Sequence, residues 1–535
     1  MGLNAPLAAT TLTHVIEKGG VIGLALAVAA ILSLPEPARR RLRAPLILAT
    51  LVLTPALLAI ALWHNSKLAP LHHHPLRGVA AVVVALLTIA SLVLLLARRP
   101  TLLPLLAIAA LPFRIPLGTV SSGLLVPLYA VIAAGVISHI ARNWRTPASG
   151  AGEDGRDSGR PQPRGNQSGR LPAPAPGLVE YLLSAYLLLY AIQASYSTDL
   201  TKAVEQVGFF YVPFALLFFL LRGVRWDRAL LERCLWLVTS LALLFALVGF
   251  VELARGGLLF NRSLDADAYF VRINSLFYDP NIYGRFLALA MIVLTVALLF
   301  TRRRRAALLA AGALAVMWAG LALSLSQSSV VALLAGLAVA AIGAWGRRAA
   351  AVVAVLAVLG VAGGLAIALH SNNSANDLTS GRSSLVRGGV DLFDARPLAG
   401  YGSGSFSTEY VAHVPRHPNA FERRWHLPVT LPATSDSHTT AITIAAEQGL
   451  VGLALYAALL IACFARLFGG GVFAPLRSPA GVARLAVAAA FTGLVVHTLF
   501  YADFLEDPTT WVLLAVGIAL APRRATPSPT QTAPT

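Results

Sequence analysis

Long apolar runs separated by short polar segments dominate the hydrophobic pattern of this chain. With about 20 apolar residues taken as one membrane span, the pattern predicts about fifteen candidates, of which the shortest are candidate re-entrant segments. These candidates lie near residues 20–34, 45–62, 78–97, 101–113, 123–141, 178–193, 207–222, 232–254, 282–300, 306–325, 329–346, 349–369, 438–465, 484–503 and 510–522. The predicted fold class is an all-α, polytopic transmembrane helix bundle of about 12–15 spans, with a large extracytoplasmic loop that contains surface helices.

Polar stretches divide this pattern into parts. Residues 142–176 are rich in Gly, Pro, Arg and Ser and show no apolar periodicity, which predicts a flexible cytoplasmic linker. The predicted organisation comprises N-terminal transmembrane helices over 1–141, the linker over 142–176, transmembrane helices over 177–369 with an outer segment at 255–281, the extracytoplasmic loop over 370–437, C-terminal transmembrane helices over 438–522 and a disordered tail over 523–535.

Composition and charge support a membrane protein. The chain is 57% hydrophobic and 12% charged, whereas soluble proteins carry about 25% charged residues. The net charge of +18 resides largely in Arg clusters at the ends of apolar runs, for example 302–305 and 347–348. This is the positive-inside pattern, which places the clusters in the cytoplasm and argues against nucleic-acid binding.

One cluster of polar residues stands at the end of the large loop. His438 opens the next predicted span, Asp436 lies two residues before it, and Ser437 is a candidate helix N-cap. A neutral imidazole oriented by a carboxylate is a suitable general base for a hydroxyl. The alternative interpretation is a histidine solvated at the membrane interface.

The same predicted span carries an acid and two glycines. Glu447 lies about 13 Å deeper than His438 by the helical rise, where an acid must face the bundle interior or find a partner. Gly449 and Gly452 share one helix face and predict the close approach of another helix.

A second cluster precedes the span near 282–300. Arg272 is followed by the Asp279-Pro280-Asn281 segment, which predicts a turn and a capped helix start. An Arg beside a helix N-terminus suits an anion such as a diphosphate, because guanidinium and free N–H groups both donate hydrogen bonds. Contact with lipid headgroups is the alternative. Arg285, inside the span, needs a partner or must extend to the interface.

A third cluster lies within the large loop. Arg382 and Arg387 begin a segment whose apolar residues have helical spacing, which predicts an amphipathic helix along the membrane surface. The residues 394–397 should end this helix, and three glycines between 400 and 404 permit a tight turn.

In this order, the clusters resemble the O-antigen ligase and O-antigen polymerase superfamily of bacterial membrane glycosyltransferases, over about residues 180–520. The matching positions are Arg272 with Asp279-Pro280-Asn281; Gly381-Arg382, Arg396-Pro397-Leu398, Gly400, Gly402 and Phe406; and His438, Glu447, Gly449 and Gly452. The chain departs from the family pattern at Thr439, where Asn, Ser or Gln is usual, and at Ser326-Gln327, where a Ser-Arg pair is usual.

The resemblance implies a C-type glycosyltransferase fold and a metal-independent, inverting enzyme without cofactors. The donor would be a glycan on undecaprenyl diphosphate, and the acceptor a hydroxyl of lipid A core, of a growing polysaccharide or of a glycoprotein. The site would face outward from the cytoplasmic (inner) membrane, among membrane lipids. The implied roles are His438 as base and Asp436 as its orienting partner; Arg272, Arg382, Arg387 and Asn281 as donor-binding residues; and Asp279, Glu447, Gly449 and Gly452 as supporting residues.

Several functions remain open at this point. A ligase transfers a finished polysaccharide, a polymerase of O-antigen or teichuronic type joins lipid-linked repeat units, and a protein O-oligosaccharyltransferase modifies Ser or Thr. The His438, Gly449 and Gly452 pattern favours the ligase branch. A transporter is a remote alternative. Transporters are expected to show internal repeats and a site at the membrane midplane, whereas the polar residues of this chain gather at the predicted outer face.

Overall fold

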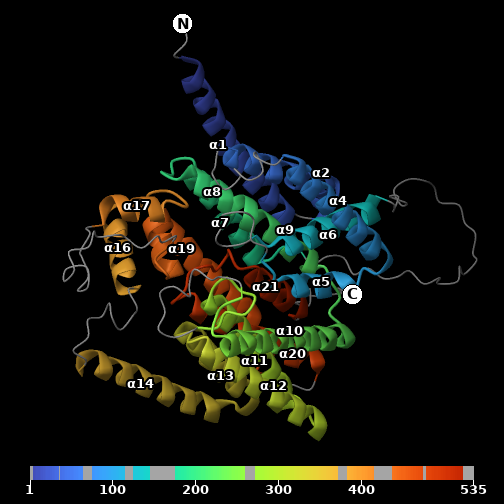
Figure 1. Ribbon diagram of the computed structural model, residues 1–535, viewed down its shortest axis with the longest axis vertical. Coiled ribbons are helices and arrows are strands. Elements are labelled where there is room, and N and C mark those ends of the chain that lie inside the picture. The colour runs from blue at the N-terminus through green and yellow to red at the C-terminus, as the bar shows by residue number, and fades with distance from the viewer. Residues whose placement is uncertain are drawn as a thin grey trace, which may run out of the picture.

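The computed structural model describes residues 4–34, 36–63, 75–114, 124–144, 175–259, 272–370, 382–414, 436–470, 472–473 and 478–521. Throughout these residues the protein is helical, and they form no β-sheet (Figure 1). Most of the predicted linker (145–174), the predicted tail, and parts of the two predicted outer segments (260–271, 371–381 and 415–435) lie outside the described residues.

The helices follow the predicted spans in order. They are α1 (Asn4–Ser33), α2 (Glu36–Leu62), α4 (Pro75–Arg98), α5 (Leu102–Ala110), α6 (Val126–Trp144), α7 (Leu178–Ala194), α8 (Leu200–Gln206), the π-helical turn η2 (Val207–Tyr211), α9 (Val212–Arg222), α10 (Arg228–Arg255), α11 (Pro280–Phe300), α12 (Arg304–Leu323), α13 (Gln327–Trp345), α14 (Arg347–His370), α16 (Arg382–Ala395), α17 (Phe406–His413), α19 (Thr440–Phe468), α20 (Pro479–His497) and α21 (Pro508–Leu520).

This is a multi-pass membrane protein with an all-α fold, as the sequence predicts. Among the described helices, 10 are long and apolar enough to cross a membrane, and α8, η2 and α9 together form one of them. Only 6% of the apolar window of α4 is buried within the protein, so its apolar surface is available to lipid. One predicted boundary is wrong: the span near 484–503 ends at His497, and residues 498–507 form a non-helical connection to α21 that carries three acids.

Two apolar cores hold the bundle together. The first gathers α1, α7, α9, α19 and α21, and the second gathers α10, α11, α12, α13 and α20. A small third core joins α16 and α17 to α19, and Figure 1 shows these three helices side by side at one edge of the molecule. The helices of the predicted large loop are therefore packed against the bundle through α19.

Helix α19 is broken near its start. Gly449 has φ 65° and ψ −163°, a backbone conformation that is essentially restricted to glycine. Two N–H groups released by this break find partners in the loop that follows α16: Leu450 N donates to Pro397 O at 2.7 Å and Val451 N donates to Leu398 O at 3.4 Å. A helix can be interrupted within a membrane only where the freed polar groups are paired in this way.

The loop beside Gly449 replaces the neighbouring helix that the sequence predicts there. A Cβ on Gly449 would lie 2.4 Å from the backbone carbonyl of Leu398, whereas a Cβ on Gly452 would meet the side chain of Gln448 in its own helix. The prediction of helix-to-helix contact at these glycines is therefore wrong, because the break at Gly449 admits a loop instead.

Glu447 fastens the predicted glycine turn to α19. Its two carboxylate oxygens accept hydrogen bonds from Gly404 N at 2.9 Å and Phe406 N at 3.1 Å, and its carbonyl oxygen accepts one from Gly402 N at 2.8 Å. Gly400, Gly402 and Gly404 all have positive φ, as a tight turn requires. The expectation that the buried acid finds partners is confirmed, and its partners are backbone N–H groups.

We predict that Gly449→Ala destabilises the protein more than Gly256→Ala. Gly256 is left-handed helical (φ 65°, ψ 29°), where an alanine costs about 1–2 kcal/mol, and a Cβ there meets nothing within 4 Å. Gly449 has the same φ but a ψ of −163°, a conformation essentially restricted to glycine, and a Cβ there would also clash with Leu398. Thermal unfolding of the detergent-purified variants measures the difference. Equal losses in Tm would contradict a special requirement for glycine at position 449.

Candidate functional site

Arg272 and Arg382 lie far apart in the chain but within electrostatic reach of each other in the fold. Arg272 Nε donates to Ser324 O at 3.1 Å, which anchors it at the end of α12. Partial burial lowers the pKa of the Arg272 guanidinium, Asp279 opposes that shift, and the positive charge of Arg382 adds to it. The two cations are therefore electrostatic neighbours, an arrangement that favours an anionic ligand.

The predicted turn at Asp279 forms as expected. The Asp279 carboxylate accepts a hydrogen bond from Asn281 N at 2.6 Å and caps α11, and Pro280 occupies the first turn of the helix. The Asn281 side-chain oxygen accepts a hydrogen bond from Ser326 Oγ at 2.9 Å. Asn281 thus links the start of α11 to the start of α13, and its predicted donor-binding role stays a prediction.

Buried serines surround the position where the sequence departs from the Ser-Arg pair. Ser326 Oγ lies 2.8 Å from Ser329 Oγ, and Ser328 Oγ lies 3.2 Å from His497 Nε2. Gln327 is exposed at the first residue of α13, between the buried Ser326 and Ser328. The hydroxyl groups therefore form a bonded network under the start of this helix while Gln327 faces outward.

Arg382 is positioned by the close packing of α16 on α19. A Cβ on Gly389 would lie 2.5 Å from Ile442, so only glycine lets the two helices approach this closely. Arg382 begins α16 and lies within electrostatic reach of both Arg272 and His497. Arg387, five residues further on, lies more than a third of a turn around the helix from Arg382 and is exposed. Among the described contacts none connects Arg387 with Arg272.

His438 occupies a strained position immediately before α19. Its φ is 58°, which is uncommon for a residue other than glycine and is often found at functional sites. Asp436 Oδ1 accepts a hydrogen bond from His438 N at 2.7 Å and lies 3.9 Å from Nδ1. The second distance is too long for a hydrogen bond, so Asp436 orients the backbone of His438 and supplies a nearby negative charge.

The start of α19 differs from the prediction at Ser437. The helix begins at Thr440, and Ser437 Oγ donates to Thr439 O at 2.9 Å instead of capping the helix. Thr439 Oγ1 donates to Leu499 O at 3.0 Å, and Thr440 N donates to Thr498 O at 3.1 Å. The hydroxyl at Thr439, where the sequence departs from the family pattern, therefore ties α19 to the end of α20.

Tyr501 connects His438 with the basic residues. Its ring lies 5.9 Å from the His438 ring and 5.7 Å from the His497 ring, and the Arg285 guanidinium carbon lies 5.9 Å from its centre. Arg285 finds the partner that the sequence requires, because it pairs with buried Asp507 at 2.9 Å. The ion pair with Asp507 holds Arg285 against the face of the Tyr501 ring.

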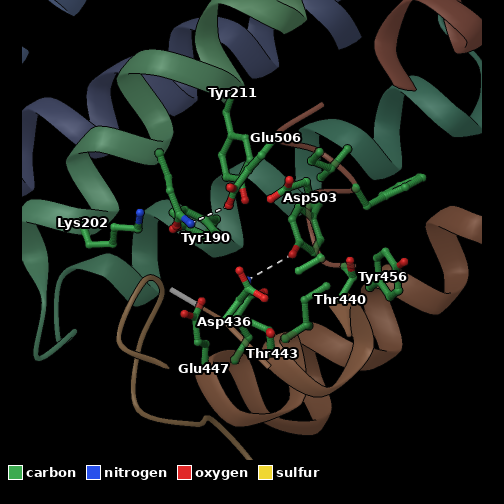
Figure 2. A pocket seen from close by; sticks show the side chains of 17 residues that line it. Tyr190, Lys202, Tyr211, Asp436, Thr440, Thr443, Glu447, Tyr456, Asp503 and Glu506 are labelled. Atoms are coloured by element: carbon green, nitrogen blue, oxygen red, sulfur yellow. Dashed lines mark hydrogen bonds between the residues drawn. The ribbon is translucent and has the colours of Figure 1, made fainter. Parts of the chain in front are cut away.

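Asp436 also lines an acidic cavity, most of which the sequence did not predict. We call it the acidic cavity; it measures about 60 Å³. Figure 2 shows Asp503 and Glu506 on one side, Asp436 and Glu447 on the other, and Lys202 at one edge. Its remaining lining residues are Tyr186, Tyr190, Gln206, Tyr211, Thr440, Thr443, Ile444, Gln448, Tyr456, Ala502, Phe504 and Leu505.

Burial shapes the electrostatics of the acidic cavity. It raises the pKa of Glu506 to about 7; Lys202 opposes that shift, and Asp436 and Glu447 add to it. Burial and the neighbouring Glu506 also raise the pKa of Asp503, which has φ of 100°. The signal that could have revealed this site is the run of three acids in residues 503–507, immediately before the proline that starts α21.

The described residues contain no group of three or more His, Cys, Asp or Glu side chains arranged to hold a metal ion. The predicted residues that the structure does bring together are Arg272, Arg382, Asp279, Asn281, Asp436 and His438. They surround the starts of α11, α13 and α19 and the end of α20, while Glu447, Gly449 and Gly452 lie within α19.

A comparison with protein families matches residues 312–457 to the family described as O-antigen ligase. Over these residues the chain is similar to an O-antigen ligase domain. The match confirms the resemblance to the ligase and polymerase superfamily, whose members are glycosyltransferase-type enzymes of polysaccharide biosynthesis. The domain includes Arg382, His438 and Glu447, while Arg272 precedes it and Glu506 follows it. A search of curated proteins finds no significant match.

We predict that stability falls as the pH rises from about 5 to 8, and that Glu506→Gln reduces this fall. The folded-state pKa of Glu506 is raised from 4.5 to about 7, so the native state binds the proton more tightly than the unfolded chain. The stability that this proton contributes is fully present when the pH is below the pKa of Glu506 in the unfolded chain. It is lost as the pH rises through the pKa of Glu506 in the folded protein, and the loss is on the order of 1–3 kcal/mol.

The measurement is Tm against pH for the wild type, for Glu506→Gln and for Glu232→Gln, an exposed carboxylate outside the cavity. A Glu506→Gln profile as steep as that of the wild type would contradict the assignment of this titration to the acidic cavity.

Proposed function

We propose that the protein transfers a glycan from undecaprenyl diphosphate to an acceptor hydroxyl at the outer face of the bacterial cytoplasmic membrane. The observation that carries the proposal is that Arg272 and Arg382 lie within electrostatic reach of each other, in a chain where Arg382 and the His438–Asp436 pair fall within the residues that match the O-antigen ligase family. An anion-binding group next to an accessible base is what transfer from a diphosphate donor requires.

The two guanidinium groups suit the diphosphate of the donor. Guanidinium forms charge-assisted hydrogen bonds to phosphate oxygens and carries a permanent positive charge. As the bond between the anomeric carbon and the diphosphate oxygen breaks, the electron pair stays with the diphosphate. Arg272 and Arg382 would stabilise that charge in a partly buried setting, where such an interaction is stronger than in water.

His438 suits the acceptor side of the same step. Its side chain is 36% exposed, so an acceptor can reach it, and Nδ1 faces Asp436. Nε2 is then the nitrogen that takes the proton as the acceptor oxygen attacks the anomeric carbon. A single displacement of this kind inverts the configuration at that carbon. Asp436 would stabilise the imidazolium that forms.

The direction of the helices supports an outward-facing site. Helices α11 and α13 present their first residues to the site, and their opposite ends lead into the clusters 302–305 and 347–348. Since Arg clusters of this kind stay in the cytoplasm, the site faces the other side. The polyprenyl tail of the donor could then remain in the membrane while its diphosphate lies at headgroup level. We also propose the division of the chain predicted from the sequence, with the linker over 142–176 in the cytoplasm and the loop over 370–437 on the outer side.

The test is glycan transfer by purified protein in the presence of EDTA. The donor is an undecaprenyl-diphosphate-linked glycan, offered with lipid A core, with a second lipid-linked repeat unit or with a Ser/Thr peptide. Transfer to lipid A core would indicate a ligase, and chain extension a polymerase. We predict that His438→Ala and Arg382→Ala each lower the transfer rate by about 10²–10⁴-fold.

Arg255→Ala serves as the matched control, because Arg255 is an exposed arginine at the end of α10. It should retain wild-type transfer, and Tm should confirm that all variants are folded. Full activity of folded His438→Ala would rule out its role as the base. Complete loss of wild-type transfer in EDTA would rule out a metal-independent reaction.

A further inference from the structure

The acidic cavity contains buried polar atoms that have no partner within the described protein. They are Tyr190 OH, Gln448 Oε1, Gln206 Oε1 and Thr440 Oγ1. Tyr190 and Gln448 are each only 1% exposed. A buried polar atom without a hydrogen bond is costly, so four of them around one cavity indicate that something else supplies the missing bonds.

The chemistry of these atoms specifies a ligand that donates hydrogen bonds. The Gln206 amide nitrogen donates to Glu506 at 2.5 Å and the Gln448 amide nitrogen donates to Tyr186 OH at 3.1 Å, which leaves each amide oxygen as an acceptor. The Tyr190 and Thr440 hydroxyls can both accept and donate. Carboxylates of Asp436 and Glu506 add further acceptors. A molecule rich in hydroxyl groups matches this set.

The lining of this cavity suits a neutral ligand better than the diphosphate. Four carboxyl groups line it and Lys202 is the one cationic residue among its lining residues, which do not include Arg272 or Arg382. A neutral sugar is not repelled by carboxylates, and sugar hydroxyls donate readily to them. The proposed base His438 lies two residues from Asp436, which lines the cavity.

We propose that the acidic cavity is the acceptor subsite, in which hydroxyl groups on one edge of the acceptor sugar bind Tyr190, Gln206, Gln448 and Thr440 while a further hydroxyl reaches His438. This assignment rests on the proposed function. The cavity volume of about 60 Å³ admits an edge or a hydroxymethyl group and leaves the rest of the sugar outside. The acceptor would then supply the partners that these atoms lack within the described protein, which would make them determinants of acceptor specificity.

The test uses Tyr190→Phe and Thr440→Val, which remove the two unpartnered hydroxyls. Neither hydroxyl has a hydrogen-bond partner among the described protein atoms, so their removal breaks no bond within the protein and should leave Tm unchanged or higher. We predict that the KM for the acceptor that supports wild-type transfer rises about three- to tenfold in each variant. The KM for the donor and the rate of donor hydrolysis without acceptor should stay at wild-type values.

Tyr283→Phe is the matched control. Its hydroxyl is also buried without a partner, but it lies in the core formed by α10, α11 and α12, away from the cavity. It should leave the acceptor KM unchanged. Three results would overturn the acceptor subsite. The first is a rise in the donor KM of the cavity variants equal to the rise in their acceptor KM, the second is an unchanged acceptor KM in both variants, and the third is transfer to the Ser/Thr peptide alone. Donor consumption without transfer to any acceptor would instead contradict the proposed function.

Discussion

The site depends on the broken start of α19 and the loop that fills the break. Gly449 interrupts the helix, the carbonyls of Pro397 and Leu398 pair the released N–H groups, and Glu447 binds the turn that follows. Unpaired backbone groups are costly within a membrane, so the break and the loop must form together. Through this junction the segment that begins with Arg382 is fixed to the helix that begins just after His438.

Around this junction the basic residues and the acidic cavity form separate regions. Arg272 and Arg382 lie within electrostatic reach of each other, and neither lines the acidic cavity, which is lined by Asp436 beside His438. Glycosyl transfer uses such a contrast, because the donor leaves as an anion and the acceptor is a neutral hydroxyl that must lose a proton. In the proposed function the basic residues would bind the diphosphate, and the acidic cavity would bind the acceptor.

Apolar periodicity and charged turns were enough to predict the helix bundle, the capped turn at Asp279 and the surface segment from Arg382. They could not predict that Gly449 breaks α19, since a glycine in an apolar run indicates helix packing equally well. Arg387 is exposed and lies on a different face of α16 from Arg382, and its donor-binding role stays a prediction. Most of the acidic cavity was missed because residues 498–503 were assigned to a span, and because Lys202 reaches the cavity from a helix that is distant in sequence.

The central claim is that Arg272 and Arg382 bind one diphosphate. A double-mutant cycle on the KM for the lipid-linked donor tests it most directly, with Arg272→Ala, Arg382→Ala and the double variant. Two residues that share one ligand group should couple, so we expect the double variant to differ from the sum of the single losses by about 0.5–3 kcal/mol. Strictly additive losses would show that the two guanidinium groups act independently and would contradict the account.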